Sequence, residues 1–306
     1  MRKSIKLIAL LISLAGCFTA SAQQDPRYTG YLTNMLPINP AYAGSINGIS
    51  STLMYRNQWT RLEGAPVNLT ASIHSPIENT KGAVGLLFVN DQQGLQSTNT
   101  ISGVYSYKIS LPSGSLSLGL QGSIINYNLG LNRLYVKDPN DPAFTANESL
   151  WLPNVGAGIY YQNDKLALGI SSPRLISSNL IEDYQYVIGE PKSHYFLTAA
   201  YLFDLNADWK LKASTLGKYV PNAPFNADLN ATFIFQDRIW IGAGFRTFSE
   251  WSILTQYQVN RNLWIGYAFD VAIQTYNRGL YGPSHEIALG YNFSLNKSRI
   301  ISPRYF

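Results

Sequence analysis

The chain has 306 residues, of which 46% are hydrophobic and only 13% are charged, about half the charged fraction of an average soluble protein. Tyrosine outnumbers phenylalanine by 21 to 13, and this excess, together with low charge, is typical of a protein with aromatic girdles at two membrane interfaces. The net charge of +5 includes three basic residues in the first 22 positions and falls to +2 (5 − 3) without them, so it gives no argument for nucleic-acid binding. Composition alone also suits a large soluble β-sandwich or propeller.

The first 22 residues have the pattern of a secretory signal peptide. A basic start precedes the apolar stretch 7–15, and small residues at positions 20 and 22 form a cleavage site. The apolar stretch is too short to cross a bilayer as a helix, and no later segment reaches about 18 uninterrupted apolar residues. We therefore expect residues 1–22 to be removed after Ala22, which leaves an exported chain that begins at Gln23.

A second cleavage pattern overlaps the first. Residues 14–17 read LAGC, which resembles a bacterial lipoprotein box and would leave Cys17 lipidated at the new N-terminus. Cleavage after Ala22 is favoured because a polar segment follows it. Cys17 is the single cysteine of the chain, so the mature chain then contains no disulfide.

Residues 23–47 form a segment of their own. Three prolines and the lack of sustained alternation argue against a regular strand here, yet the segment is too apolar for a disordered tail. We expect an ordered N-terminal segment that packs on or inside the domain that follows. The alternative is a periplasmic extension with one short helical turn.

From residue 48 onward the chain alternates between apolar and small or polar residues, which is the period of a β-strand. In the run 263–270, for example, Ile265, Tyr267 and Phe269 alternate with smaller or more polar residues such as Asp270. The runs are about ten residues long, which is the length of a tilted strand that crosses a bilayer, and turns of two or three residues join many of them, which favours antiparallel hairpins. Because an exported chain without spanning helices can cross lipid only as a closed barrel, we predict an all-β fold, a transmembrane antiparallel β-barrel over residues 48–306 in the outer membrane.

The runs number about 14. They cover residues 48–59, 67–75, 83–91, 98–111, 115–127, 154–162, 165–172, 194–205, 209–220, 226–236, 238–247, 251–260, 263–270 and 284–292. Residues 128–152 and 173–192 break the alternation and are expected to be long loops that face outward, while the short turns face the periplasm.

The inward positions of these runs are polar and rich in glycine but carry few recognisable charges. Arg238 and Arg246 are candidates for the lumen, but no dense ring of opposite charges, as in a porin eyelet, is visible. A lumen that is filled rather than conducting follows from this pattern.

Residues that carry chemistry are sparse. The three histidines, His74, His194 and His285, lie in separate runs without a metal-binding spacing. Nucleophile elbows, P-loops and dinucleotide-binding fingerprints are missing. We expect neither catalysis nor a cofactor, although distant strands could still bring a Ser/His/acid set to one rim.

Two sequence elements are distinctive, NPAYAG at Asn39–Gly44 and YRNQW at Tyr55–Trp59. With shorter matches such as GAP at 64–66, GYAFD at 266–270 and SHEI at 284–287, they resemble the PorP/SprF family of Bacteroidetes in order along nearly the whole mature chain. The positions singled out by this resemblance are Asn39, Pro40, Ala41, Tyr42, Gly44, Arg56, Trp59, Pro66, Asp270, His285 and Glu286.

The resemblance implies an outer-membrane barrel of the type IX secretion system. Members of the family assist secretion of gliding adhesins and hold cargo with a type B C-terminal domain at the cell surface, and one branch works with the periplasmic core ring. No catalytic residues are known to carry over, so the signature residues serve either the fold or a partner. For Arg56 and Trp59 we expect a lumen anchor for the N-terminal segment, or, as the simpler alternative, an arginine paired with acidic or carbonyl groups of the lumen face.

Two functions stay open. The first is a barrel that binds and anchors a secreted partner, and the second is a diffusion channel for small solutes. Aromatic residues are favoured anchors in protein interfaces, so those of the predicted long loops are candidate cargo contacts, unless they only pack the loops together. They are Tyr135, Phe144, Trp151, Tyr184 and Tyr186.

Overall fold

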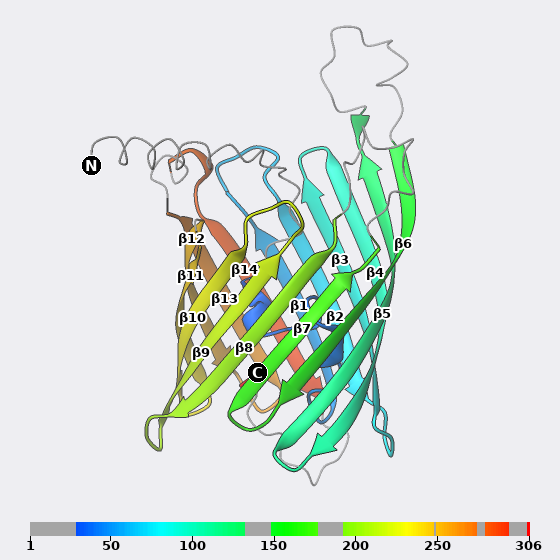
Figure 1. The fold of residues 1–306 in the computed structure, drawn as a ribbon. Helices are drawn as coiled ribbons and strands as arrows, with labels where there is room; N and C mark the ends of the chain where they lie inside the picture. Colours follow the sequence, from blue (N-terminus) through cyan, green and yellow to red (C-terminus); the bar gives the residue numbers. More distant parts are fainter. Residues whose placement is uncertain (1–28, 132–147, 177–191, 248, 274–278, 294–304) are drawn as a thin grey trace, which may run out of the picture.

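Fourteen antiparallel strands form one closed barrel in the computed structural model, and each strand pairs with its neighbour in sequence until β14 returns to β1 (Figure 1). The structure describes residues 29–131, 148–176, 192–247, 249–273, 279–293 and 305–306. The predicted barrel and its number of strands are confirmed. The strands are β1 (Ile49–Asn57), β2 (Val67–Pro76), β3 (Gly82–Gln93), β4 (Gln96–Leu111), β5 (Gly114–Leu129), β6 (Glu148–Gln162), β7 (Leu166–Arg174), β8 (His194–Asp204), β9 (Trp209–Tyr219), β10 (Asn226–Phe235), β11 (Ile239–Arg246), β12 (Glu250–Gln258), β13 (Leu263–Ala272) and β14 (Ser284–Phe293).

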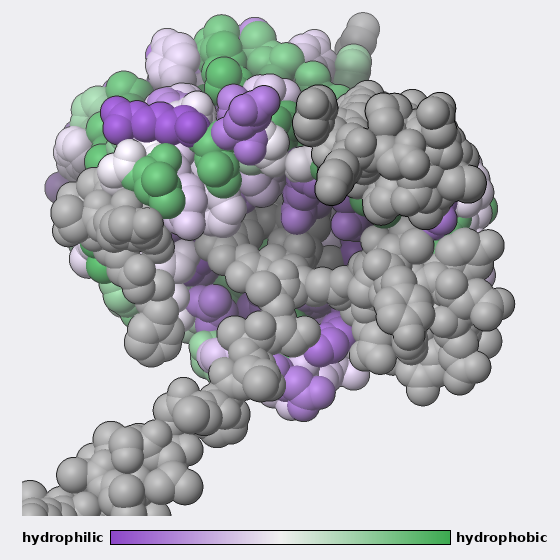
Figure 2. Space-filling model, turned by 90° about the horizontal axis from the view of Figure 1, so that it is seen from above, coloured by the Kyte–Doolittle hydropathy of each residue, from purple (hydrophilic) through white to green (hydrophobic). Residues whose placement is uncertain are grey.

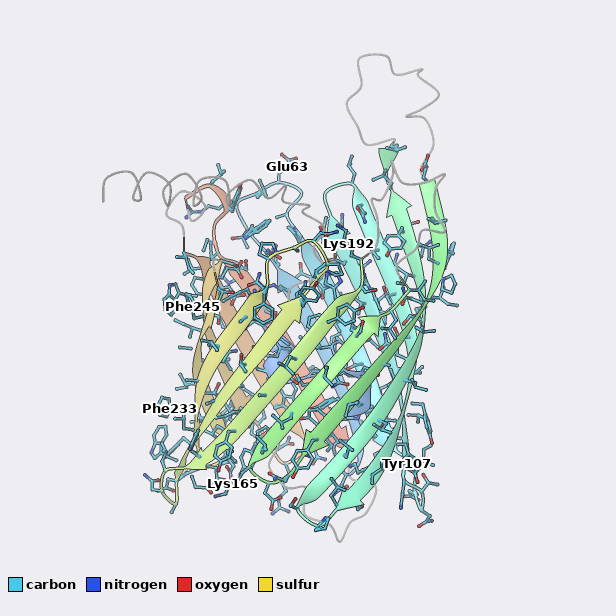
Figure 3. The ribbon with its side chains drawn as sticks, in the orientation of Figure 1. Glu63, Tyr107, Lys165, Lys192, Phe233 and Phe245 are labelled. Atoms are coloured by element: carbon cyan, nitrogen blue, oxygen red, sulfur yellow. The ribbon has the colours of Figure 1, made fainter. Side chains whose placement is uncertain are left out.

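Alternation separates the two faces of the wall. In β13, Ile265 is 46% exposed on the outside, whereas its neighbour Trp264 is 3% exposed inside the barrel. Outward side chains such as Phe233 and Phe245 point away from the barrel (Figure 3). Large apolar side chains on the outer face and smaller or polar ones inside are the arrangement that lipid around a barrel requires.

The two ends of the barrel differ. At one end, called the short-turn end, tight connections such as 163–165 and 236–238 join the strands; at the other, the long-loop end, lie the connections that follow β1, β5 and β7. Lys165 marks the first end, and Glu63 and Lys192 mark the second (Figure 3). None of the helices among the described residues is long and apolar enough to span a membrane.

The prediction of a loop over 128–152 is wrong at both ends. β5 continues to Leu129, and β6 begins at Glu148, where Trp151 pairs with Asn126. The alternation is hidden because Leu150 and Leu152 pack inward against Ile125 while the outward Trp151 is also large and apolar. Trp151 therefore belongs to the outer wall, where it is 62% exposed, and not to a loop.

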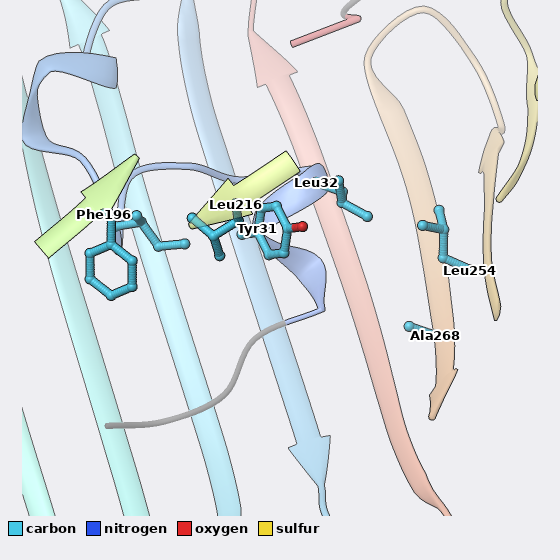
Figure 4. Close-up of a cluster of buried hydrophobic side chains, with 7 residues drawn as sticks. Tyr31, Leu32, Phe196, Leu216, Leu254 and Ala268 are labelled. Atoms are coloured by element: carbon cyan, nitrogen blue, oxygen red, sulfur yellow. The ribbon is translucent and has the colours of Figure 1, made fainter. Parts of the chain in front are cut away.

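Residues 29–44 lie inside the barrel, and together with residues 45–48, which lead into β1, we call them the plug. Two short 3₁₀ helices, η1 (Gly30–Leu32) and η2 (Pro40–Tyr42), shape it, and Leu36 and Tyr42 have no exposed surface. The plug begins beside Glu286 near the long-loop end and ends beside His74 near the short-turn end, where β1 starts. One buried apolar cluster joins Tyr31 and Leu32 of the plug to side chains of β8, β9, β12 and β13 (Figure 4).

The last two residues of the chain, Tyr305 and Phe306, also lie against the lumen wall, and we call them the tail. They pack against buried side chains of β8, β10 and β11 at the short-turn end. The two ends of the described chain thus meet inside the barrel, where the Tyr42 hydroxyl donates a hydrogen bond to the Phe306 carbonyl oxygen at 3.3 Å.

Candidate functional site in the barrel lumen

The NPAY turn of the plug is held by Asn39. Its side-chain oxygen accepts a hydrogen bond from the Ala41 N–H at 2.9 Å and so caps η2, while Pro40 occupies the first helical position. The Asn39 amide nitrogen donates to the Ile159 carbonyl oxygen of β6 at 3.0 Å. One asparagine thus starts the turn, as such caps do, and also fastens it to the wall.

Three glycines of the wall make room for this turn. A Cβ atom at Gly119 of β5 would overlap the backbone of Ala41, and one at Gly158 of β6 would overlap the Asn39 side chain. A Cβ at Gly169 of β7 would lie 2.9 Å from the Asn39 amide nitrogen. Since inward glycines on three successive strands face one turn, wall and plug fit each other at close range.

Wall side chains satisfy the backbone of the plug at several levels. Lys212 donates to the Leu32 carbonyl oxygen at 3.1 Å, and Ser171 donates to that of Ile38 at 2.9 Å. The plug has little regular secondary structure of its own, and buried carbonyl groups without a partner are costly. These side chains therefore supply the hydrogen bonds that a helix or a sheet would otherwise give to the plug backbone.

The last part of the plug is fixed by β2 and β4. The Gly44 N–H donates to His74 Nδ1 at 3.1 Å, and Lys108 donates to the Gly44 carbonyl oxygen at 2.7 Å. Gly44 has a φ of 72°, a conformation that favours glycine. The ring of Tyr42 meets His74 and Tyr160 edge-on.

A cluster of charged side chains holds the start of the plug. Arg56 bonds Asp270 and, at 3.1 Å, Glu286. Thr29 joins these groups, since its N–H donates to Glu286 at 3.1 Å and its hydroxyl donates to Asp270 at 3.0 Å. Arg56 in turn donates to the Thr29 hydroxyl oxygen at 3.2 Å.

The same cluster continues along the wall. Arg246 makes two hydrogen bonds of 2.9 Å to Asp228 and one of 2.8 Å to Glu250. Glu250 lies 3.9 Å from Arg56, so the two halves connect. Two arginines and four carboxylates from β1 and β10–β14 thereby meet in the lumen.

This cluster corrects the expectation of a lumen with few charges. Arg238 is exposed in the turn after β10, whereas Arg246 is in the lumen. The partners that sequence reasoning missed, Asp228 and Glu250, each occupy an inward strand position. The alternation of β10 and β12 shows that Asp228 and Glu250 face inward. That the two carboxylates meet in one cluster depends on strand tilt and pairing, which the sequence does not show.

Other predicted residues lie apart from the plug. Trp59 follows β1 at the long-loop end, with its ring 5.3 Å from that of Tyr281, and the Pro66 carbonyl oxygen accepts from the Gln58 N–H. His285 points outward and bonds the Tyr267 hydroxyl at 2.7 Å. The loop aromatics Tyr135, Phe144, Tyr184 and Tyr186 lie outside the described residues.

The opening at the long-loop end is lined by hydrophilic side chains, as seen from above (Figure 2). Within the described part of the chain, His, Cys, Asp and Glu form no group of three or more that could hold a metal ion. The lumen is occupied by the plug, which side chains and carbonyl groups of the wall hold in place.

The barrel is similar to several solved structures of low sequence identity. A FadL homologue from Pseudomonas aeruginosa has 13% identity and a TM-score of 0.49, over 90% of this chain and 96% of that one. The toluene transporter TodX from Pseudomonas putida has 10% identity and a TM-score of 0.48, over 88% and 95%. The outer membrane protein Omp33 from Acinetobacter baumannii has 11% identity and a TM-score of 0.43, over 82% and 100%.

A search of curated proteins finds no match. The family model of the type IX secretion system membrane protein PorP/SprF matches residues 20–291. This match includes the plug, the charge cluster and all fourteen strands except the last two residues of β14. The chain belongs to the PorP/SprF family of type IX secretion system membrane proteins and is a β-barrel of the outer membrane.

Proposed function

We propose that this barrel assists the secretion and cell-surface anchoring of one specific cargo protein, of the gliding-adhesin class or with a type B C-terminal domain. The observation that supports this proposal is the plug. It runs through the lumen from near the long-loop end to near the short-turn end. Hydrogen bonds join it to β1, β4, β6, β7 and β9. A barrel filled in this way offers a partner its rims and outer wall rather than a passage.

The signature residues divide between two roles in this proposal. Asn39, Tyr42, Gly44 and Arg56 hold the plug, directly or through Asp270 and Glu286. Trp59 and Pro66, at the long-loop end, shape the rim where cargo would bind. The exposed Trp151 on the upper wall and the segment 173–192 complete the proposed contact surface.

A diffusion channel is the second candidate, but it needs a continuous water path. The plug residues Leu36 and Tyr42 are fully buried among wall side chains, so a conducting state needs a path past the plug or its displacement. Conductance of the purified barrel in planar bilayers separates the two candidates. Stable open-channel currents from the intact chain would favour the channel.

Deletion of the gene tests the anchoring proposal. We expect one secreted protein to disappear from the cell surface or to appear in the medium, while other type IX substrates are still exported. Shortening 173–192 in a barrel that still assembles should give the same phenotype, and shortening the turn 205–208 at the opposite end is the matched control. Loss of all type IX export would instead assign the barrel to the core machine and its periplasmic ring.

The leader can be tested on the same cells. We propose cleavage after Ala22, and mass spectrometry of the mature N-terminus should then find Gln23, either free or cyclised. An acylated Cys17 would establish the lipoprotein alternative.

A further inference from the structure

The tail occupies a prepared site at the short-turn end of the lumen. The ring of Tyr305 stacks on Trp240, with centroids 6.3 Å apart and an angle of 20° between the planes. Its hydroxyl donates to Asp237 at 2.8 Å and also bonds Lys210. Lys210 and Asp237 are themselves paired at 2.6 Å, so one ion pair receives the phenol.

Phe306 lies deeper between the wall and the plug. The Lys212 ammonium group is 5.9 Å from the centre of its ring, a distance at which a cation is attracted to an aromatic face. The carbonyl oxygen of Phe306 accepts from the Tyr42 hydroxyl at 3.3 Å. The ring of Phe306 and its carbonyl oxygen thus each have a partner.

The wall around the tail carries one of the buried apolar clusters of the lumen. Most inward positions of β9 to β14 are polar or small, but Leu202 of β8, Ile234 of β10 and Trp240 of β11 form a cluster on which the tail packs. Trp240 breaks the apolar/polar alternation of β11, because this large apolar side chain points inward directly after the outward Ile239. An apolar patch beside an ion pair suits an aromatic ring with a hydroxyl group.

The described contacts of Tyr305 and Phe306 involve two ring faces, one phenol hydroxyl and one backbone carbonyl oxygen. Both residues stay partly exposed, unlike Leu36 and Tyr42 of the plug, which are fully buried. Another chain with two adjacent aromatic residues could make the same contacts from the short-turn end.

We propose that the short-turn end of the lumen is a binding site for a polypeptide segment with two adjacent aromatic residues, and that Tyr305 and Phe306 occupy this site until such a partner displaces them. Short turns of outer-membrane barrels face the periplasm, so the partner would be a periplasmic or newly exported chain. The proposal is independent of the cargo surface at the other end.

Peptide binding to the purified barrel tests the proposal. The probe is a fluorescent peptide of residues 301–306, ISPRYF, and the receptors are the full chain and a chain that lacks residues 305–306. The truncated chain should bind at least about tenfold more tightly than the full chain, because it has no competing tail. A peptide with unrelated residues before Tyr-Phe should bind equally well, and one that ends in Ala-Ala should not bind.

Variants of the wall locate the binding. Trp240→Leu in the truncated chain should abolish the gain in affinity, whereas Trp209→Leu, which changes an outward tryptophan at the same end, should retain it. Heat-modifiable mobility in electrophoresis establishes that each variant is a folded barrel. Should Trp240→Leu fail to fold, Lys210→Met is the second variant, since it removes the partner of the phenol hydroxyl.

Two results would overturn the proposal. In the first, the folded truncated chain does not bind the peptide, so the site does not recognise a separate aromatic segment. In the second, the truncated chain binds but the full chain does not at any peptide concentration. The tail would then be a permanent part of the wall rather than an exchangeable occupant.

Discussion

The plug and the tail fill the same lumen by different means. The plug is bonded through its backbone, since wall side chains reach its carbonyl oxygens at Leu32, Ile38, Ala43 and Gly44, and wall glycines are shaped to its turn. The tail is bonded through rings, one hydroxyl and one backbone carbonyl oxygen. Backbone bonding at several levels specifies one segment in one register, whereas ring contacts accept any segment of similar chemistry. The difference separates a permanent part of the barrel from an exchangeable one.

The largest effect is expected at the charge cluster that holds the plug. Arg56→Met removes the cation between Asp270 and Glu286, and leaving buried carboxylates without a partner costs about 3–5 kcal/mol. Denaturant unfolding in detergent should show this loss. The control is Lys165→Met, which breaks an exposed pair with Asp204 and should leave the free energy of unfolding nearly unchanged. Similar losses in the two variants would mean that the cluster does not hold the plug.

A matched pair of glycines tests the fit between wall and plug. In β5, Gly119 faces the plug, while a Cβ at Gly122 on the outer face would meet nothing within 4 Å. Gly119→Ala should destabilise the barrel by about 1–3 kcal/mol through overpacking and expose the plug to protease, and Gly122→Ala should do neither. If both variants keep a protected plug, the plug adapts to the wall more easily than its contacts indicate.

A smaller effect compares the two segments directly. Asn39→Ala removes the cap of η2 and the bond to β6, and losing such a cap costs about 0.5–2 kcal/mol. Deletion of residues 305–306 should lower the free energy of unfolding by no more than the loss of this cap does, because the tail stays partly exposed. A larger loss on deletion would make the tail a structural element of the same kind as the plug.

The sequence predicted the wall better than its contents. Alternation located β13 and the outward Tyr267 because lipid imposes one rule on every strand. The alternation identified Asp228 and Glu250 as inward residues. The charge cluster that they complete forms only when six strands come together in the closed barrel. The tail has too few residues for any periodicity, and its site is built from turns and strand ends far apart in the sequence. Contacts that arise only when the barrel closes leave no local pattern.

The smallest predicted effect concerns pH and the tail alone. Burial in the lumen, reinforced by the nearby Asp237, raises the pKa of the Tyr305 hydroxyl above its ordinary value, although Lys210 opposes this shift. The neutral phenol therefore favours the docked tail. This contribution is fully present below about pH 10, the pKa of a free tyrosine, and is lost as the pH rises through the higher pKa of the docked state.

The emission of Trp240 reports this change, as the difference between the wild-type barrel and Trp240→Phe. We expect an alkaline transition in the wild type that is missing in Tyr305→Phe, whose ring can still stack on Trp240 but cannot ionise. The plug should stay protected from protease across the same range, because its bonds from Asn39 to Ile159 and from Lys108 to Gly44 do not involve this phenol. If the transition persists in Tyr305→Phe, the titrating group is Lys210, which faces the same ring. The ionisation of the phenol would then have no part in holding the tail.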